Sequence, residues 1–208
     1  MNYIKCKVCG VSETIGCSCL TPQPNTNYGR EVYSNSWGNF VKENVKVDVR
    51  CDLTMRKCIE SNSNDVFGVP ATRYKTYITE AIAYDNIGQF CDRLNYASYK
   101  HAYKRYGKRL NIVSAVEGGD ADLRENGFDN DKGKRLHAHL LLQQPSHIDF
   151  DTFKTLIIRH WINTPWGYNQ HNIEEIKTIK GSAKYNTKST MDNADLKNTY
   201  FDDSVMCN

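Results

Sequence analysis

Two imidazoles lie two residues apart, at His137 and His139, inside the otherwise apolar run from Arg135 to Leu142. Side chains alternate between the two faces of a strand, so both histidines are expected to share one face, where they could hold a metal ion together. Ordinary strand histidines that hydrogen-bond to their neighbours would give the same pattern. Residues 111–117 predict a second strand that ends in an acid. Antiparallel pairing of the two strands would let Glu117 approach both histidines.

A second group of chemically capable residues is Lys184, Tyr185 and Lys188, in a helix expected over residues 181–189. Residues three or four positions apart share a helical face, so a phenol would lie beside two ammonium groups. A phenol is a weak nucleophile until a cation helps its proton to leave, and a lysine can also hold a phosphate. A surface helix with solvated lysines would show the same spacing.

The elements that must position these residues follow from periodicity. The aromatic and β-branched run Tyr74 to Tyr84 predicts a strand, and Asp85 is expected to cap a following helix. Asp149 or Asp151 is expected to cap a second helix, and residues 171–179 predict a fourth strand. The apolar stripes of the two helices comprise Ile87, Phe90, Leu94, Ala97 and Tyr106, and Phe150, Phe153, Ile157, Ile158 and Trp161.

This order of strands and helices predicts an α+β fold with an antiparallel sheet covered by helices, of the split βαβ kind. The first helix carries basic residues towards its end, which could form a basic face or be solvated charges. We expect an N-terminal extension over residues 1–70, the main domain over residues 71–190 and a C-terminal tail over residues 191–208. A short strand is expected where Val45, Val47, Val49 and Cys51 alternate with polar residues.

The N-terminal extension is rich in cysteine. Cys6, Cys9, Cys17 and Cys19 could hold one structural zinc ion, with Cys51 and Cys58 as competing ligands. Free thiols in a flexible leader are the alternative. The chain shows no apolar run that could span a bilayer and no secretory pattern, so a soluble intracellular protein without disulfides is expected. A formal net charge of +3 permits a nucleic-acid partner without requiring one.

Together, a strand ending in Glu117, the His137-Ala138-His139 strand and the later Tyr185-x-x-Lys188 resemble the HUH endonuclease superfamily. More narrowly, the chain resembles the single-tyrosine rolling-circle replication initiators of small single-stranded DNA viruses, phages and plasmids. The resemblance covers roughly residues 72–190. It implies an RRM-like or ferredoxin-like HUH fold, a divalent metal, Mg²⁺ or Mn²⁺, on the two histidines with Glu117 as third ligand, and Tyr185 as nucleophile assisted by Lys188.

The implied activity is nicking and rejoining of single-stranded DNA, or of an origin hairpin, through a covalent 5′-phosphotyrosine. Lys184, Trp166 and Tyr168 are candidate DNA contacts, although the two aromatic residues could instead pack beneath a turn. The chain has no Gly-x4-Gly-Lys-Ser/Thr phosphate loop, so a separate helicase is the expected partner. The compartment would be bacterial cytoplasm for a phage or plasmid, and the nucleus for a eukaryotic virus.

Alternative functions stay open at the level of sequence. A related tyrosine transposase or relaxase would use the same residues, and a noncatalytic single-strand-binding module would use none of them catalytically. A nucleotide hydrolase of the histidine-triad type would need a third histidine at position 141, which is leucine. That last reading is therefore set aside.

Overall fold

The computed structural model describes residues 38–62, 73–119, 135–179, 182 and 199–201. They form a five-stranded antiparallel sheet in the order β6-β1-β5-β4-β7, together with a separate two-stranded hairpin. The sheet strands are β1 (Val49–Met55), β4 (Ile112–Glu117), β5 (His137–Leu142), β6 (Gly167–Glu175) and β7 (Thr199–Phe201), and the hairpin strands are β2 (Cys58–Asn62) and β3 (Arg73–Tyr77). The helices are α2 (Glu80–Tyr99), α3 (His101–Tyr106), α5 (Phe150–Ile162) and a short helix over residues 38–44. The expected α+β class with an antiparallel sheet and covering helices is confirmed.

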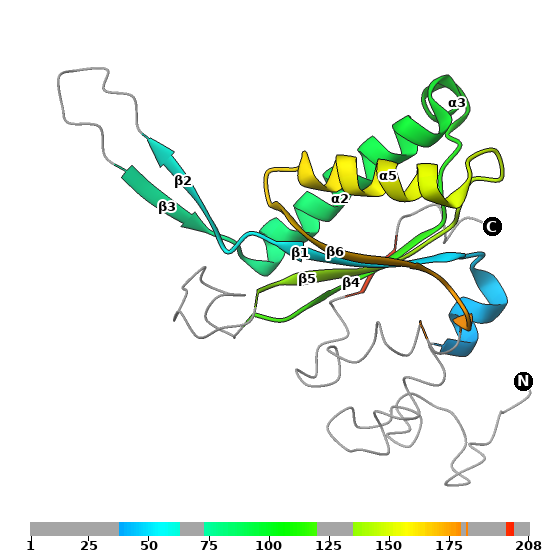
Figure 1. The fold of residues 1–208 in the computed structure, drawn as a ribbon, viewed down its shortest axis with the longest axis horizontal. Helices are drawn as coiled ribbons and strands as arrows, with labels where there is room; N and C mark the ends of the chain where they lie inside the picture. The colour runs from blue at the N-terminus through cyan, green and yellow to red at the C-terminus, as the bar shows by residue number, and fades with distance from the viewer. Residues whose placement is uncertain (1–37, 63–72, 120–134, 180–181, 183–198, 202–208) are drawn as a thin grey trace, which may run out of the picture.

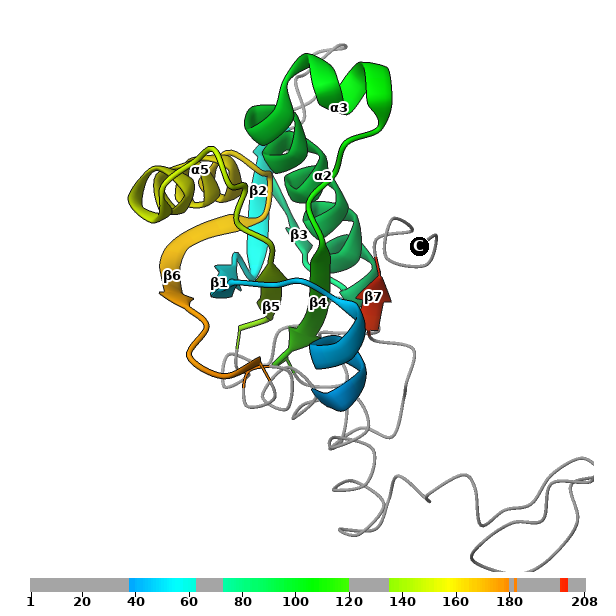
Figure 2. The same ribbon diagram turned by 90° about the vertical axis from the view of Figure 1, so that its right-hand side faces the viewer.

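Helices α2 and α5 cover one face of the sheet (Figures 1 and 2). The two helices meet where the rings of Phe90 and Trp161 pack edge to face, 5.5 Å apart between centroids. The indole of Trp161 also donates a hydrogen bond to the Thr54 carbonyl oxygen of β1, which ties α5 to the sheet. No helix in the described part of the chain is long and apolar enough to cross a membrane. The buried residues of this main core include Cys51, Leu53, Ile87, Leu94, Ala138, Leu140, Phe153 and Ile157.

A smaller core covers part of the opposite face of the sheet. The segment after the helix over residues 38–44 supplies Val45 and Val47, which pack with Val113 of β4 and Leu141 of β5. Leu141 is buried here whereas Leu140 belongs to the main core, as strand alternation requires. Residues 41–47 thus cover one end of this second face.

Strand β1 lies in the middle of the sheet, between β5 and β6. Its pairs include Cys51 with Leu140 on β5 and Cys51 with Ile173 on β6. The expected boundary at residue 70 placed this strand in an N-terminal extension, and the pairing corrects that position. The sheet domain begins before residue 49.

The predicted strand over residues 74–84 is wrong after Tyr77. Strand β3 ends there and, within the residues that the structure describes, pairs only with β2 in the hairpin, which projects from the domain in Figure 1. Helix α2 then begins at Glu80 with Thr79 as its N-cap, so Asp85 is not a cap. Apolar residues at helical spacing, such as Ala83, Ile87 and Phe90, bury one face of α2 against the sheet and override the local strand propensity.

Thr79→Ala is expected to lower the free energy of unfolding by about 1 kcal/mol. The Thr79 hydroxyl accepts a hydrogen bond from the Ile82 backbone N–H, 3.3 Å away, which satisfies one of the free amides in the first turn of α2. Urea unfolding of the wild type and the variant would measure the change. Thr155→Ala, at an exposed position within α5, is the control, and an equal loss in both variants would contradict a capping role.

Two other predictions are largely confirmed. Asp149 caps α5 by accepting a hydrogen bond from the Thr152 backbone N–H, and Phe153, Ile157 and Trp161 are buried beneath that helix. The fourth strand exists but runs over residues 167–175 rather than 171–179. Tyr106, expected in the apolar stripe, is 79% exposed because the chain turns at Lys100 and starts α3.

Candidate metal centre

Four ionisable side chains gather on the sheet face opposite α2 and α5. His137 of β5 is paired with Glu117 of β4, and His139 of β5 is paired with Asp52 of β1. Residues directly opposite one another in an antiparallel pair project to the same face, and so do residues two apart along one strand. The predicted approach of Glu117 to both histidines is therefore confirmed, and Asp52 joins them from a strand that sequence reasoning placed elsewhere.

His139 lies between two carboxylates. Its Nδ1 atom is 2.6 Å from Oδ1 of Asp52, and its Nε2 atom is 2.6 Å from Oε2 of Glu117. The His139 side chain is only 6% exposed, against 19% for Asp52 and 33% for Glu117. Both ring nitrogens of a nearly buried imidazole thus face acceptors, which favours the doubly protonated cation.

The pKa values of the cluster follow from this arrangement. Burial alone lowers the pKa of His139, but the hydrogen bonds and charges of Asp52 and Glu117 outweigh burial and raise it to about 9. Burial also opposes ionisation of Asp52, yet contact with His139 and the charge of Arg50 lower the pKa of that carboxyl group. Burial and the neighbouring charge of His139 lower the pKa of His137, which therefore stays neutral at neutral pH.

The protein without divalent metal is expected to lose stability as pH rises from about 6.5 to about 9. An unfolded histidine releases its proton near pH 6.5, whereas folded His139 holds its proton to about pH 9, so this stabilisation is complete below 6.5 and lost above 9. The loss is at most about 3.5 kcal/mol, since one pKa unit corresponds to about 1.4 kcal/mol. Thermal unfolding in EDTA across this range would measure the decline. His139→Gln should flatten it and His101→Gln should not; an unchanged decline in His139→Gln would assign the proton to another group.

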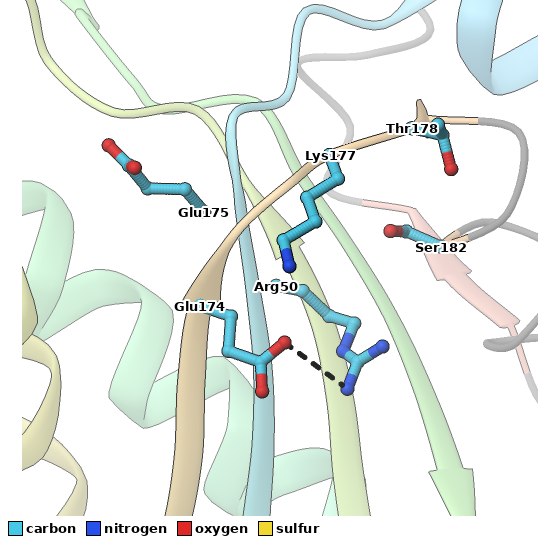
Figure 3. A pocket seen from close by; sticks show the side chains of 6 residues that line it. All are labelled: Arg50, Glu174, Glu175, Lys177, Thr178 and Ser182. Atoms are coloured by element: carbon cyan, nitrogen blue, oxygen red, sulfur yellow. Dashed lines mark ion pairs between the residues drawn. The ribbon is translucent and has the colours of Figure 1, made fainter.

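Asp52 was not identified from the sequence. It is also held by Arg50, whose Nη2 atom lies 3.2 Å from Oδ2 of Asp52 and 3.9 Å from Oε2 of Glu174. Arg50 and Glu174 line a polar pocket of about 170 Å³ beside β6, together with Glu175, Lys177, Thr178 and Ser182 (Figure 3). The alternation of Val45 to Cys51 was a visible signal, because its continuation places Asp52 on the polar face of an apolar strand, together with Asp48 and Arg50.

Asp52→Asn is expected to weaken Mn²⁺ binding by about 10- to 100-fold. A carboxylate that accepts the second ring proton of a metal-binding histidine fixes the tautomer and the orientation of the ring, and the amide keeps its shape but loses its charge. Calorimetric Mn²⁺ titration would measure the change. Glu174→Gln is the matched control because Glu174 pairs with Arg50 from the neighbouring strand. Equal losses in the two variants would indicate a general effect of charge.

The chain approaches the site closely at Gly118. Its φ of +87° is a conformation that favours glycine, and a β-carbon there would overlap the Arg135 carbonyl oxygen and lie 3.3 Å from Nδ1 of His137. A glycine directly after Glu117 thus lets the end of β4 lie close to the start of β5 at His137.

Several other candidate residues lie outside the described part of the chain, namely Tyr185, Lys184, Lys188, Cys6, Cys9, Cys17 and Cys19. Cys51 is fully buried in the main core, where burial raises the pKa of its thiol far above the usual value, so it is no thiolate ligand. Trp166 is 8% exposed and part of the core, in agreement with the alternative that this residue packs beneath a turn. Tyr168 is 38% exposed, and the guanidinium of Arg135 lies 4.3 Å from its ring centroid.

The donor set is chemically suited to a divalent ion, because two imidazoles and one or two carboxylates supply nitrogen and oxygen ligands. Within the described ranges, no three His, Cys, Asp or Glu side chains are already arranged to hold a metal ion. Glu117 instead contacts His139 directly. A metal ion could take the place of the proton between these two side chains.

Comparison of the chain with models of known protein families, with curated proteins and with solved structures found no match. The function has to be inferred from the side chains of this chain.

Proposed function

We propose that the protein is a metal-dependent single-strand DNA endonuclease of the replication-initiator type, which nicks and rejoins DNA through Tyr185. The observation that carries the proposal is the placement of Glu117, His137 and His139 on one sheet face, at adjoining ends of β4 and β5. That is the ligand set that the resemblance to HUH endonucleases implies, contributed by neighbouring strands.

The topology supports the same proposal. Strands β1, β4, β5 and β6 lie in the spatial order β6-β1-β5-β4, with α2 between β1 and β4 and α5 between β5 and β6 along the chain. This order is compatible with the split βαβ sheet expected for an HUH domain. The β2–β3 hairpin is an insertion between β1 and α2, and β7 adds an edge strand to β4.

The chain's own residues would act as follows. His137, His139 and Glu117 would hold the divalent ion, and the Asp52 carboxylate orients the His139 ring through Nδ1. The bound ion supplies Lewis-acid chemistry to the scissile phosphate. The Tyr185 oxygen, having lost its proton to solvent with the help of the Lys188 ammonium group, forms a bond to phosphorus. The bond from phosphorus to the 3′ oxygen breaks, and that oxygen takes up a proton.

The products are a 5′-phosphotyrosine and a free 3′-hydroxyl, so the phosphodiester energy is kept for rejoining. Attack by a 3′-hydroxyl on the phosphotyrosine reverses the step, restores the phenol and needs no nucleotide cofactor. A separate helicase would supply single-stranded substrate.

The test is incubation of the protein with a broad pool of single-stranded oligonucleotides, with Mn²⁺ or with EDTA. A covalent protein–DNA adduct should form only with Mn²⁺, and peptide mass analysis should place it on Tyr185. An adduct on another tyrosine would keep the reaction class and overturn the assigned nucleophile. Binding of the pool by folded protein without any adduct would favour a noncatalytic single-strand-binding module instead.

A further inference from the structure

The most basic surface among the described residues lies on and after α3. We define the α3 basic patch as Lys100, Lys104, Arg105, Lys108 and Arg109, all of them exposed. Residues 100–109 contain no Asp or Glu. Helix α3 has no buried residue, so burial in the core does not account for its presence. Its two ends are set by backbone turns with positive φ, at Lys100 (52°) and Gly107 (65°).

Three of the five cations of this patch lie against aromatic rings. Lys104 lies 5.1 Å from the ring centroid of Tyr96, Lys108 lies 4.8 Å from that of Tyr99, and Arg109 lies 5.2 Å from that of Tyr103. A cation–π contact orders a long side chain without neutralising its charge. Lys104 and Lys108 therefore present ordered positive charge, which suits a row of phosphates.

The same contacts leave less aromatic surface for stacking of unpaired bases, which is an argument for duplex over single-stranded DNA. Unpaired bases bind by stacking on open aromatic faces, and a cation already occupies one face of each of Tyr96, Tyr99 and Tyr103. Contacts from Lys and Arg to the phosphate backbone need no open ring.

The patch also lies away from the candidate metal centre. It precedes Ile112, the first residue of β4, whereas Glu117 is the last, and α3 stands beyond the sheet in Figure 1. Five steps along a strand span about 17 Å, and the metal centre faces the side of the sheet opposite α2 and α3, so the separation exceeds about five base pairs of duplex. A nucleic acid that reached both surfaces would contact the patch several nucleotides from the cleaved position.

We propose that the α3 basic patch binds the phosphate backbone of a duplex DNA segment next to the cleaved single strand, such as the stem of an origin hairpin. This proposal rests on the proposed function in taking DNA as the partner. It adds a second, sequence-independent contact that positions the substrate without taking part in the chemistry.

The test compares two triple variants of the full chain that remove the same amount of positive charge. Lys104→Gln/Arg105→Gln/Lys108→Gln removes three of the five cations of the patch, and Lys42→Gln/Lys46→Gln/Arg159→Gln removes three exposed cations elsewhere. Binding of a fluorescent 20-base-pair duplex would be measured at several salt concentrations. The patch variant should bind at least about tenfold more weakly, and its log–log salt slope should be shallower by about 0.9 for each phosphate that it no longer neutralises. The control should stay within about twofold of wild type, and adduct formation on a single-stranded oligonucleotide should be unchanged in both.

Equal weakening in the two variants, or none in the patch variant, would overturn the proposal. Polyglutamate serves as a model of an acidic protein. If the patch variant binds polyglutamate more weakly than wild type but binds the duplex as well as wild type, the proposal is overturned in favour of an acidic protein partner. If wild-type protein forms no adduct but duplex binding still depends on the patch, the endonuclease proposal fails and the duplex contact stands.

Discussion

Tyr185→Phe is expected to abolish covalent attachment to DNA and to slow cleavage by at least about 10⁴-fold, because no other group of the proposed site replaces the attacking oxygen. Affinity for single-stranded DNA should stay within a few-fold of wild type, since phenylalanine keeps the ring and loses one hydroxyl. Single-turnover cleavage of an oligonucleotide selected from the adduct experiment would give the rate. Fluorescence anisotropy with the same oligonucleotide would give the affinity.

Tyr168→Phe is the matched control for this variant, because Tyr168 is an exposed tyrosine on β6. It should retain adduct formation. If Tyr185→Phe still cleaved at more than about one-tenth of the wild-type rate, the nucleophile would be another residue or water.

His137→Ala/His139→Ala is expected to remove the metal dependence of cleavage and to weaken Mn²⁺ binding by more than about 100-fold, because both nitrogen ligands are lost. Loss of His139 also leaves the carboxylates of Asp52 and Glu117 on either side of a cavity, which costs stability. His137→Ala alone keeps the buried ion pairs and should lose metal activation while unfolding close to the wild-type temperature.

The control for the double variant is His101→Ala/His160→Ala, which removes the same number of imidazoles from α3 and α5. It should bind Mn²⁺ as wild type does. Metal-stimulated cleavage that survived in folded His137→Ala, at the wild-type Mn²⁺ concentration dependence, would rule His137 out as a ligand.

The parts of the site that could be predicted from the sequence depend on the pattern of residues close together in the chain. Alternation in residues 135–142 fixes which face His137 and His139 share. Strands that follow one another in the chain commonly pair, and the antiparallel pairing of β4 with β5 brings Glu117 to the histidines. The Asp149 cap of α5 was predictable for a related reason, since its hydrogen bond spans only three residues.

The parts that were missed depend on contacts between distant segments. Asp52 reaches His139 only because β1 inserts between β5 and β6, and no local feature of residues 49–55 specifies those neighbours. The start of α2 was missed because Tyr77, Tyr84 and the β-branched residues between them have strand propensity, whereas burial of one helical face decides the structure. For Trp166 both base stacking and packing beneath a turn stayed open, because a tryptophan after a proline gives no sign of its burial.

The central position of β1 also has a kinetic consequence. Asp52 and His139 are 87 residues apart in the chain, and β1 has even more distant partners on β6. The chain must close these long loops before the middle of the sheet can form, and closure entropy is spent before the buried contacts stabilise the product. We therefore expect helix α2 and the β2–β3 hairpin to form early and the closed sheet to form late. Until then β5 and β6 would each have an unpaired edge, and His139 would lack its contact with Asp52.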